Sequence, residues 1–267
     1  MKRFLCIALI LGVWWFAPIV NAIEPPTHPT PLAKVQLDKK RLRVHFIDVG
    51  PGLAVLVQTP DDRQQLFIDG GDKGATDIVK QYVKHFATQK RFTAAIVTHA
   101  DTDHYRGMKP LFEDYTIAEF WYSGYASEEL LKTKKGNPSE WKRFLDKVRS
   151  TQDLVAYVPL GNWVDAGDIE TIDDGETPDD RSDDVFVQHL HVDRTSPEKD
   201  PYSGRQFTES ERRNSTSLVF KLIYKDVSFL ITGDINGRNK KHTKKADDEE
   251  IDSEEYELCV SASQNQS

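Results

Sequence analysis

Residues 98–107 constrain this chain more than any other stretch, because they bring two histidines and two aspartates within six positions: His99, Asp101, Asp103 and His104. The apolar run 94–97 comes directly before them and is followed by polar residues, which predicts a buried strand. The four side chains would then leave the loop at the end of that strand, where they can converge on one point. Imidazole together with carboxylate suits zinc, and the share of carboxylates also admits manganese or iron. The pattern predicts a metal site.

Length and charge limit the other functions. A chain of 267 residues is long enough for one sizeable domain with a buried core. The formal net charge is −8, and an acidic surface repels polyanions. We therefore expect no strong non-specific nucleic-acid binding from charge alone. Neither of the two cysteines, Cys6 and Cys259, has a metal-binding spacing, and Cys6 falls in the predicted leader.

The first 41 residues read as a leader and a linker. Lys2 and Arg3 precede an apolar core at 4–20, and Ala22 is the small residue at the end of the expected cleavage site, so residues 1–22 resemble a secretory signal peptide. This predicts a secreted or periplasmic protein. The alternative is an uncleaved membrane anchor, for which the apolar run is short against the ~20 residues of a spanning helix. The proline-rich stretch 23–41 predicts an extended linker.

The remaining sequence predicts alternating strands and helices, hence an α/β fold. Periodicity predicts strands at 43–49, 53–57, 65–68, 94–97, 117–122, 185–192, 218–224 and 227–231, and helices at 75–88, from 108, and after 137. Asn137 is the expected N-cap of the last helix, with Pro138 at its first position. The acidic stretch 165–184 does not match an EF-hand and predicts a solvated loop. The polar stretch 193–213 also predicts a loop.

Two more histidines are further candidates for the metal site. His189 and His191 lie in the predicted strand 185–192, and residues two apart on a strand share a face. Either could therefore complete a site that the 98–107 loop begins.

Five blocks resemble one known family. Residues 99–107 follow H-x-D-x-D-H-x-x-G, which resembles the H-x-H-x-D-H motif of the metallo-β-lactamase fold; the aspartate at the second position is typical of the branch that contains ComEC-type competence proteins. Residues 46–52 resemble that branch's F-x-D-V-G-Q-G, with Pro51 replacing glutamine. Residues 66–71, 214–220 and 227–235 resemble later blocks, with Ser215 departing from N-N-x-S-L-V. The resemblance covers about residues 42–237 and implies an αββα sandwich.

The resemblance also implies a role for each residue. His99 and Asp101 would hold one divalent metal ion, Asp103 and His104 a second, and Asp234 would bridge the two; Asp103 would also orient the attacking water. Asp69 would brace the metal loop, and Asn214 and Ser217 would hydrogen-bond near it. The two ions would be zinc, with manganese as the alternative.

The resemblance stops after Asp234. The family continues to a V-P-H-H-G-S-like block that supplies another metal-binding histidine, and residues 238–267 contain no such block. That stretch joins a basic cluster to an acidic one and predicts a disordered tail. We therefore expect a C-terminally truncated domain at 42–237. The alternative is a short variant in which His189, His191 or a partner chain completes the site.

The expected activity is metal-dependent hydrolysis. Two metals ~3.5–4 Å apart would lower the pKa of a shared water toward ~7. The ComEC-like resemblance implies phosphodiester substrates, either DNA or a small phosphodiester; an ester or lactone substrate is an alternative. A hypothesis of another class is an inactive, degenerate module that binds metal without catalysis.

Overall fold

A computed structural model of the chain describes residues 39–151, 154, 156–160, 165–173, 181–200 and 204–236. Contacts divide the chain into two compact units, Met1–Leu37 and Asp38–Ser267, and all described residues belong to the second. The predicted signal peptide 1–22, most of the linker 23–41 and the predicted tail 238–267 lie outside the described residues. Within the described segments, no helix is both long and apolar enough to cross a membrane.

The first sheet has six strands in sequence order, which are β1 (Arg43–Phe46), β2 (Val55–Gln58), β3 (Gln65–Ile68), β4 (Arg91–Ile96), β5 (Thr116–Tyr122) and β6 (Ala156–Pro159). The pairings β1–β2 and β2–β3 are antiparallel, whereas β3 to β6 run parallel. Strands β2 and β3 are buried along their whole length, as expected for strands that are covered on both faces.

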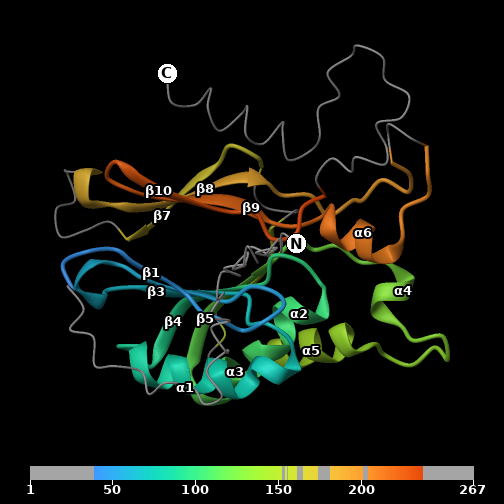
Figure 1. The fold of residues 1–267 in the computed structure, drawn as a ribbon, viewed down its shortest axis with the longest axis horizontal. Helices are drawn as coiled ribbons and strands as arrows, with labels where there is room; N and C mark the ends of the chain where they lie inside the picture. The colour runs from blue at the N-terminus through green and yellow to red at the C-terminus, as the bar shows by residue number, and fades with distance from the viewer. Residues whose placement is uncertain are drawn as a thin grey trace, which may run out of the picture. The chain divides into compact units, whose positions relative to one another are not determined.

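Helices cover one face of this sheet (Figure 1). They are α1 (Thr76–Phe86), α3 (Lys109–Asp114) and α5 (Glu140–Arg149), with the single turns α2 (Thr102–Tyr105) and α4 (Glu128–Leu131) beside them. Helix α5 begins two residues later than predicted. Its N-cap is Ser139, whose hydroxyl accepts a hydrogen bond from the Lys142 amide at 3.0 Å. The prediction of Asn137 as the cap was wrong, because Pro138 instead forms a β-bridge with Lys132.

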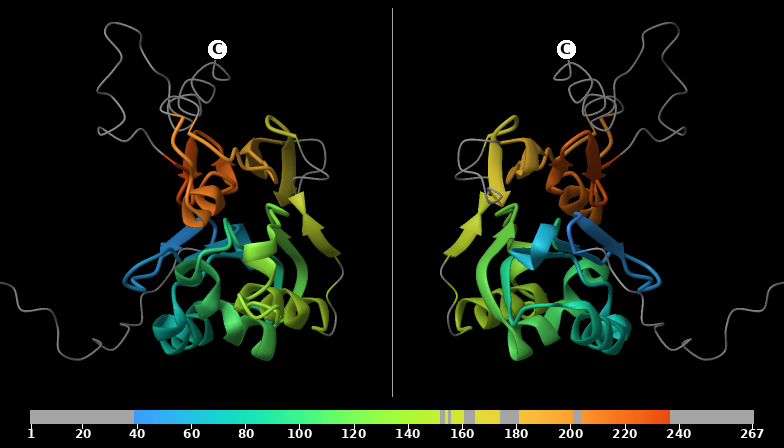
Figure 2. Two further views of the ribbon diagram at one scale, coloured as in Figure 1. Left: turned by 90° about the vertical axis from the view of Figure 1, so that its right-hand side faces the viewer. Right: turned by 90° about the vertical axis from the view of Figure 1, so that its left-hand side faces the viewer.

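The second sheet is antiparallel, in the order β10-β9-β8-β7, and consists of β7 (Ile169–Asp173), β8 (Val185–His191), β9 (Val219–Tyr224) and β10 (Val227–Ile231). It lies against the face of the first sheet opposite the helices (Figure 2). An apolar core fills the space between the sheets and includes Val55, Val57, Leu66, Ile68, Ile96, Val185, Val187, Phe220 and Leu222. The stacked sheets with helices outside the first agree with the predicted αββα class.

Two predicted loops contain regular structure. Within 165–184, β7 forms an edge strand. Asp173 at its end is buried, and the Arg63 Nε donates to both of its carboxylate oxygens, at 2.9 and 3.1 Å, which offsets the cost of burying the charge. Within 193–213, the helix α6 (Glu209–Asn214) begins with a capping box between Thr208 and Glu211. Further 3-10 turns occupy Pro60–Asp62, Lys73–Ala75, Arg106–Met108 and Arg181–Asp183.

Candidate metal centre

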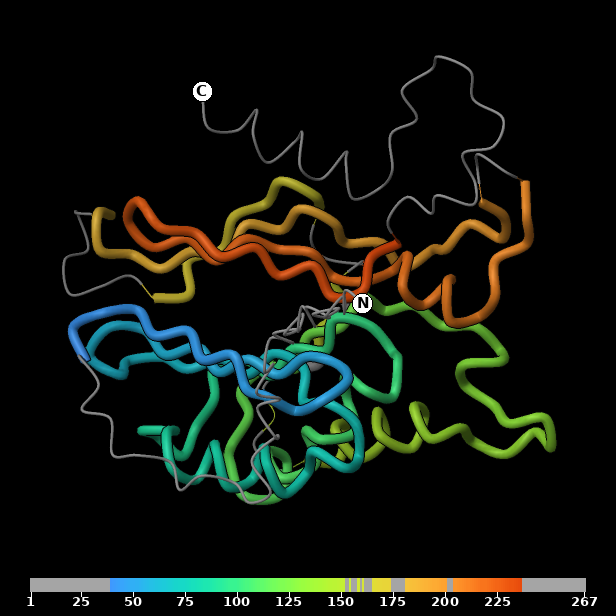
Figure 3. The backbone as a smooth tube through the Cα atoms, viewed as in Figure 1, coloured from blue at the N-terminus to red at the C-terminus, as the bar shows by residue number. Residues whose placement is uncertain are grey.

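The predicted metal loop lies at the carboxyl ends of two neighbouring parallel strands. β3 pairs with β4 in parallel, so Asp69, which follows β3, and Thr98 and His99, which follow β4, emerge at the same edge of the sheet. The path of the chain through this edge can be followed in Figure 3. The amide of Asp69 donates to the carbonyl of Ile96 at 2.8 Å, which continues the pairing by one residue. The carboxyl edge of parallel strands is a common place for a ligand site.

The side chain of Asp69 holds this loop in place through hydrogen bonds. It is fully buried and has a positive φ of 52°, which turns its side chain back toward the end of β4. Its Oδ1 accepts from the Thr98 amide at 2.8 Å, and its Oδ2 accepts from the Thr98 hydroxyl at 2.7 Å. The same Oδ2 lies 2.8 Å from Nδ1 of His104. Because a carboxylate only accepts, Nδ1 carries the proton and Nε2 of His104 faces away from Asp69.

Glycine lets the backbone close tightly around His104. The Gly70 amide donates to the carbonyl of His104 at 2.6 Å, and the Gly107 amide donates to the carbonyl of Gly71 at 2.9 Å. A Cβ atom on Gly107 would lie 1.8 Å from the carbonyl oxygen of Gly70. Any other residue at position 107 would push the metal loop away from β3.

Three of the predicted ligands meet at one point. His99, His104 and Asp234 each offer a ligand atom, and these atoms lie within 4.8 Å of one another. The two imidazole rings have centroids 4.1 Å apart, and both Nε2 atoms are buried without a hydrogen-bond partner in the described part of the chain. The Asp234 side chain is 49% exposed, and its Oδ1 lies 3.5 Å from Nε2 of His104. The cluster is therefore buried on the histidine side and open on the carboxylate side.

Asp234 reaches this point because its turn packs against the end of β4. Gly233 has a φ of +53°, and a Cβ there would lie 2.9 Å from both Cβ and Oγ1 of Thr98. The Ser217 hydroxyl accepts from the Asp234 amide at 3.3 Å, and the Leu218 amide donates to the carbonyl of Thr98 at 2.8 Å. These contacts join the ends of the two sheets, so residues from both sheets form the cluster.

The pKa values of the three residues in the cluster are shifted in different directions. Burial lowers the pKa of His99, as does the neighbouring imidazole of His104. Burial also opposes a charge on His104, but the carboxylates of Asp69 and Asp234 outweigh it and raise the pKa of His104 to about 10. The His104 imidazole in turn holds the pKa of Asp234 below its ordinary value. An opposite charge facing Asp234 is thus stabilised here, whether a proton or a cation supplies it.

These residues fit a divalent metal ion. Two buried imidazole nitrogens without a hydrogen bond are costly unless something binds them. Nitrogen and carboxylate oxygen are also the donors that zinc prefers, and three protein ligands with an open side are the arrangement of a catalytic rather than a structural zinc site. The hydrogen bond from His104 to Asp69 is the usual outer support of a metal-binding histidine.

The family match agrees with this arrangement. The family model for the metallo-beta-lactamase superfamily matches residues 47–253, more than half of the chain. The chain belongs to the metallo-beta-lactamase superfamily. The predicted fold is thereby confirmed, and so is the resemblance at the level of the superfamily; divalent metal ions, usually zinc, are typical of its members. The ComEC-type branch remains a prediction.

Solved structures of the superfamily resemble the chain only distantly. A motif mutant of a metallo-beta-lactamase from Cronobacter sakazakii is 12% identical, with a TM-score of 0.41, 75% of this chain covered and 67% of that one. The subclass B3 enzyme BJP-1 of Bradyrhizobium japonicum is 14% identical, with a TM-score of 0.40 and coverages of 72% and 60%. GOB-18 from Elizabethkingia meningoseptica is 14% identical, with a TM-score of 0.35, and the match covers 72% of this chain and 57% of that one. This chain thus spans about three fifths of the length of these structures. No curated protein matches the chain.

The other predicted ligands of the superfamily motif lie beside the cluster. Asp101 Oδ2 is 3.9 Å from Nε2 of His99, but Asp101 accepts hydrogen bonds from α6, from the Ser210 hydroxyl at 3.0 Å and from Nε of Arg213. Asn214, in the amide orientation that satisfies its neighbours, donates to Asp101 Oδ2 at 3.3 Å. Asp103 is partly exposed on α2, and its side chain forms no hydrogen bond or ion pair in the described segments.

The histidines of β8 do not join the cluster. A β-bulge between His189 and His191 shifts the register, so the two side chains do not share a face as the spacing predicted. His191 Nδ1 donates to the Ser217 carbonyl at 2.9 Å. His189 is buried, with Nε2 at 3.3 Å from Glu170 and its ring 6.0 Å from that of Trp121. In the described residues, neither belongs to a metal-binding group.

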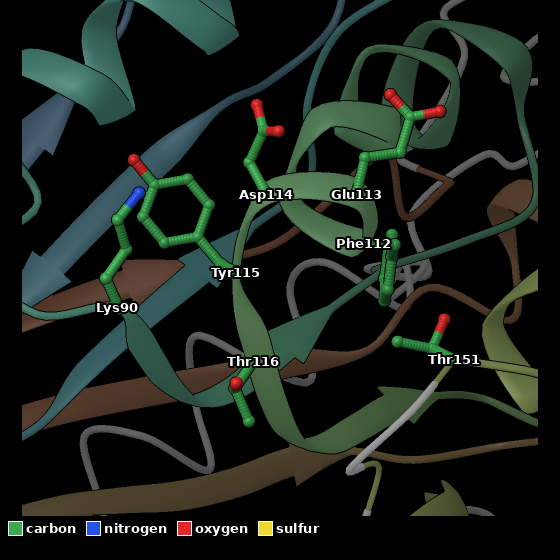
Figure 4. A pocket seen from close by; sticks show the side chains of 7 residues that line it. All are labelled: Lys90, Phe112, Glu113, Asp114, Tyr115, Thr116 and Thr151. Carbon is green, nitrogen blue, oxygen red and sulfur yellow. The ribbon is translucent and has the colours of Figure 1, made fainter.

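A surface pocket lies at the other end of the parallel strands of the first sheet (Figure 4). It is lined by Lys90, Phe112, Glu113, Asp114, Tyr115, Thr116 and Thr151. Lys90 precedes β4 and Tyr115 precedes β5, so this pocket is at the amino ends of the parallel strands, whereas the metal cluster is at their carboxyl ends. The Lys90 ammonium lies 4.5 Å from the centre of the Tyr115 ring, so the two side chains form a cation–π contact with each other.

Proposed function

We propose that this chain is a metal-dependent hydrolase that cleaves phosphodiester bonds, within the ComEC-type branch of its superfamily. The observation that carries the proposal is the pair of buried Nε2 atoms of His99 and His104, without hydrogen-bond partners and facing the carboxylate of Asp234. Nothing else in the described part of the molecule gathers metal-binding side chains in this way.

The residues around the cluster would divide the work. His99, His104 and Asp234 would hold a divalent ion, which when bound supplies a Lewis acid and lowers the pKa of water. Asp69 keeps the proton of His104 on Nδ1, so that the Nε2 lone pair is presented to the ion. Asp103, which makes no polar contact through its side chain in the described segments, is the candidate to orient the attacking water. Hydrolysis then needs a substrate whose scissile group reaches the open, Asp234 side of the cluster.

Charge favours a small phosphodiester over polymeric DNA. The formal net charge of −8 repels a long polyanion, and this repulsion accumulates with every phosphate near the surface. A substrate with a single phosphate meets far less of it. The predicted signal peptide supports a periplasmic or secreted enzyme that meets such compounds outside the cytoplasm.

Elemental analysis together with one assay tests the proposal. The purified full chain should contain zinc or manganese, and the loaded protein should hydrolyse bis(4-nitrophenyl) phosphate. Asp234→Asn should lower the metal content, whereas Asp103→Asn should lower the rate. Asp146→Asn on α5, which removes the same charge far from the cluster, should change neither. A folded chain that binds metal but hydrolyses no diester would instead support the metal-binding module without catalysis.

A further inference from the structure

Three side chains of helix α6 donate hydrogen bonds to Asp101 in the metal loop. Asp101 Oδ1 accepts from Nε of Arg213, and Asp101 Oδ2 accepts from the Ser210 hydroxyl at 3.0 Å and from the Asn214 amide at 3.3 Å. Ser210, Arg213 and Asn214 all belong to α6. Three donors from one helix thus engage the two oxygens of a residue that the superfamily motif places among its metal ligands.

One of the three guanidinium nitrogens of Arg213 is hydrogen-bonded, and the other two are available to a ligand. Its Nε is paired with Asp101, whereas in the described part of the chain Nη1 and Nη2 have no hydrogen-bond partner, and the side chain is 22% exposed. A guanidinium carries five N–H donors in a rigid plane. Fixing Nε therefore fixes the direction of the unpaired N–H groups.

The guanidinium is next to the metal cluster. The carboxylate that anchors it is 3.9 Å from Nε2 of His99, one of the two buried nitrogens that make no hydrogen bond in the described part of the chain. The acidic residues of α6 are engaged elsewhere: Glu209 accepts from the Ser127 hydroxyl, and Glu211 caps the helix and pairs with Arg205. Arg213 is therefore an anchored cation beside the open cluster.

We propose that Arg213 binds an anionic oxygen of the substrate beside the metal centre, and that Asp101 positions Arg213 there through its Oδ1. The inference rests on the proposed function, since it names the part of a phosphodiester that the site recognises. A guanidinium matches two oxygens of a phosphate group in one plane, which an ammonium does not. It also explains why an aspartate is useful at position 101, because a histidine there could not hold the guanidinium by charge.

Calorimetric titration of the zinc-loaded full chain with inorganic phosphate tests the proposal. Arg213→Gln should weaken phosphate binding by about 10- to 100-fold, the usual cost of one charged hydrogen-bonded contact. Arg212→Gln is the matched control, because it removes the same charge from the adjacent position, where the guanidinium lies 6.0 Å from the Tyr125 ring. Its binding should change by less than about threefold. Equal losses in both variants, or no phosphate binding by the unchanged protein, would overturn the proposal.

Asp101→Asn tests whether Asp101 positions Arg213. At equal zinc loading the variant should lose phosphate affinity, because a neutral amide no longer holds the guanidinium by charge. Unchanged phosphate affinity at equal zinc loading would refute the assignment of Asp101 as a positioning residue. Arg213→Lys should recover only part of the affinity, because the ammonium lacks the planar fork.

A substrate comparison connects the inference to activity. Arg213→Gln should raise KM for bis(4-nitrophenyl) phosphate, which is anionic, and leave KM for neutral 4-nitrophenyl acetate unchanged. An equal rise for both substrates would contradict an anion contact. If the chain hydrolyses neither compound, the proposed function fails, while phosphate affinity and zinc content still decide the role of Arg213.

Discussion

Nδ1 of His104 lies 2.8 Å from Oδ2 of Asp69, in a contact that is closed to solvent. The contact determines which nitrogen of His104 faces Asp234. It depends on backbone geometry, because Asp69 reaches the ring from a left-handed conformation with a φ of 52° at the end of β3. Metal affinity at this site should therefore depend on a residue that does not touch the metal.

Asp69→Asn should weaken zinc binding by about 10- to 100-fold while the protein remains folded. Asparagine tolerates the left-handed backbone, but its neutral amide no longer favours the proton on Nδ1 of His104. Competition with a chromophoric chelator measures the affinity. Asp72→Asn removes a charge three residues away, at a half-buried ion pair with Arg106, and should leave the affinity within about twofold. Equal affinities for the unchanged protein and Asp69→Asn would show that Asp69 is only a packing residue.

Gly233→Ala should displace Asp234 and destabilise the fold. The added Cβ would lie 2.9 Å from Thr98, at the junction of the two sheets. Gly136→Ala is the matched control, because Gly136 also has a positive φ but no atom within 4 Å of the added Cβ. Both variants carry a backbone cost of about 1–2 kcal/mol, so the steric overlap appears as the difference between them. Urea unfolding should give a further loss of about 1–3 kcal/mol for Gly233→Ala. Matching unfolding curves for the two variants would mean that the turn yields without cost.

The sequence predicted the first sheet well because its strands are local and apolar. Strand 65–68 was predicted at the residues where β3 lies, and the predicted helix 75–88 contains the whole of α1. The loop at 98–107 was recognisable because four ligand-type side chains within six positions are hard to reconcile with an ordinary solvated loop. Asp234 was attached to it by resemblance alone, since the long stretch between them carries no local signal of the contact, and the structure brings Asp234 within reach of His99 and His104.

The misses have physical causes. His189 and His191 were expected to share a face, and a bulge that only strand pairing reveals puts them in different surroundings. Asp173 looked like part of a solvated run, because its partner Arg63 is 110 residues away in sequence. Helix α6, and with it Arg213, was overlooked although Thr208 and Glu211 have the spacing of a capping box. That signal was available, and reading it would have placed Arg213 on a helix.

The Arg63–Asp173 pair should be costly to break and cheap to replace. Asp173 has a side chain only 2% exposed, so Arg63→Met removes an ion-pair partner from a buried carboxylate. We expect a loss of about 3–5 kcal/mol in the free energy of unfolding. The double variant Arg63→Met/Asp173→Leu should recover most of it, because neither desolvated charge remains. Urea unfolding of both variants gives the two values, and a double variant as unstable as the single one would refute the electrostatic explanation.

Glu211 should make the stability of the protein depend on pH in the acidic range. Its hydrogen bonds with Arg205 and with the backbone amide of Thr208 lower the pKa of Glu211 to about 2, from an ordinary value of 4.5. A carboxyl group with a depressed pKa stabilises the fold fully above its ordinary pKa, and this contribution is lost as the pH falls toward 2. Glu211→Gln should therefore lower Tm above pH ~5 and approach the Tm of the unchanged protein near pH ~2. Glu113→Gln, at an exposed pair with Lys109, removes the same charge and should show a much smaller difference at every pH. A Tm difference for Glu211→Gln that stays constant from pH 7 to pH 2 would show that the charge of Glu211 does not hold the start of α6.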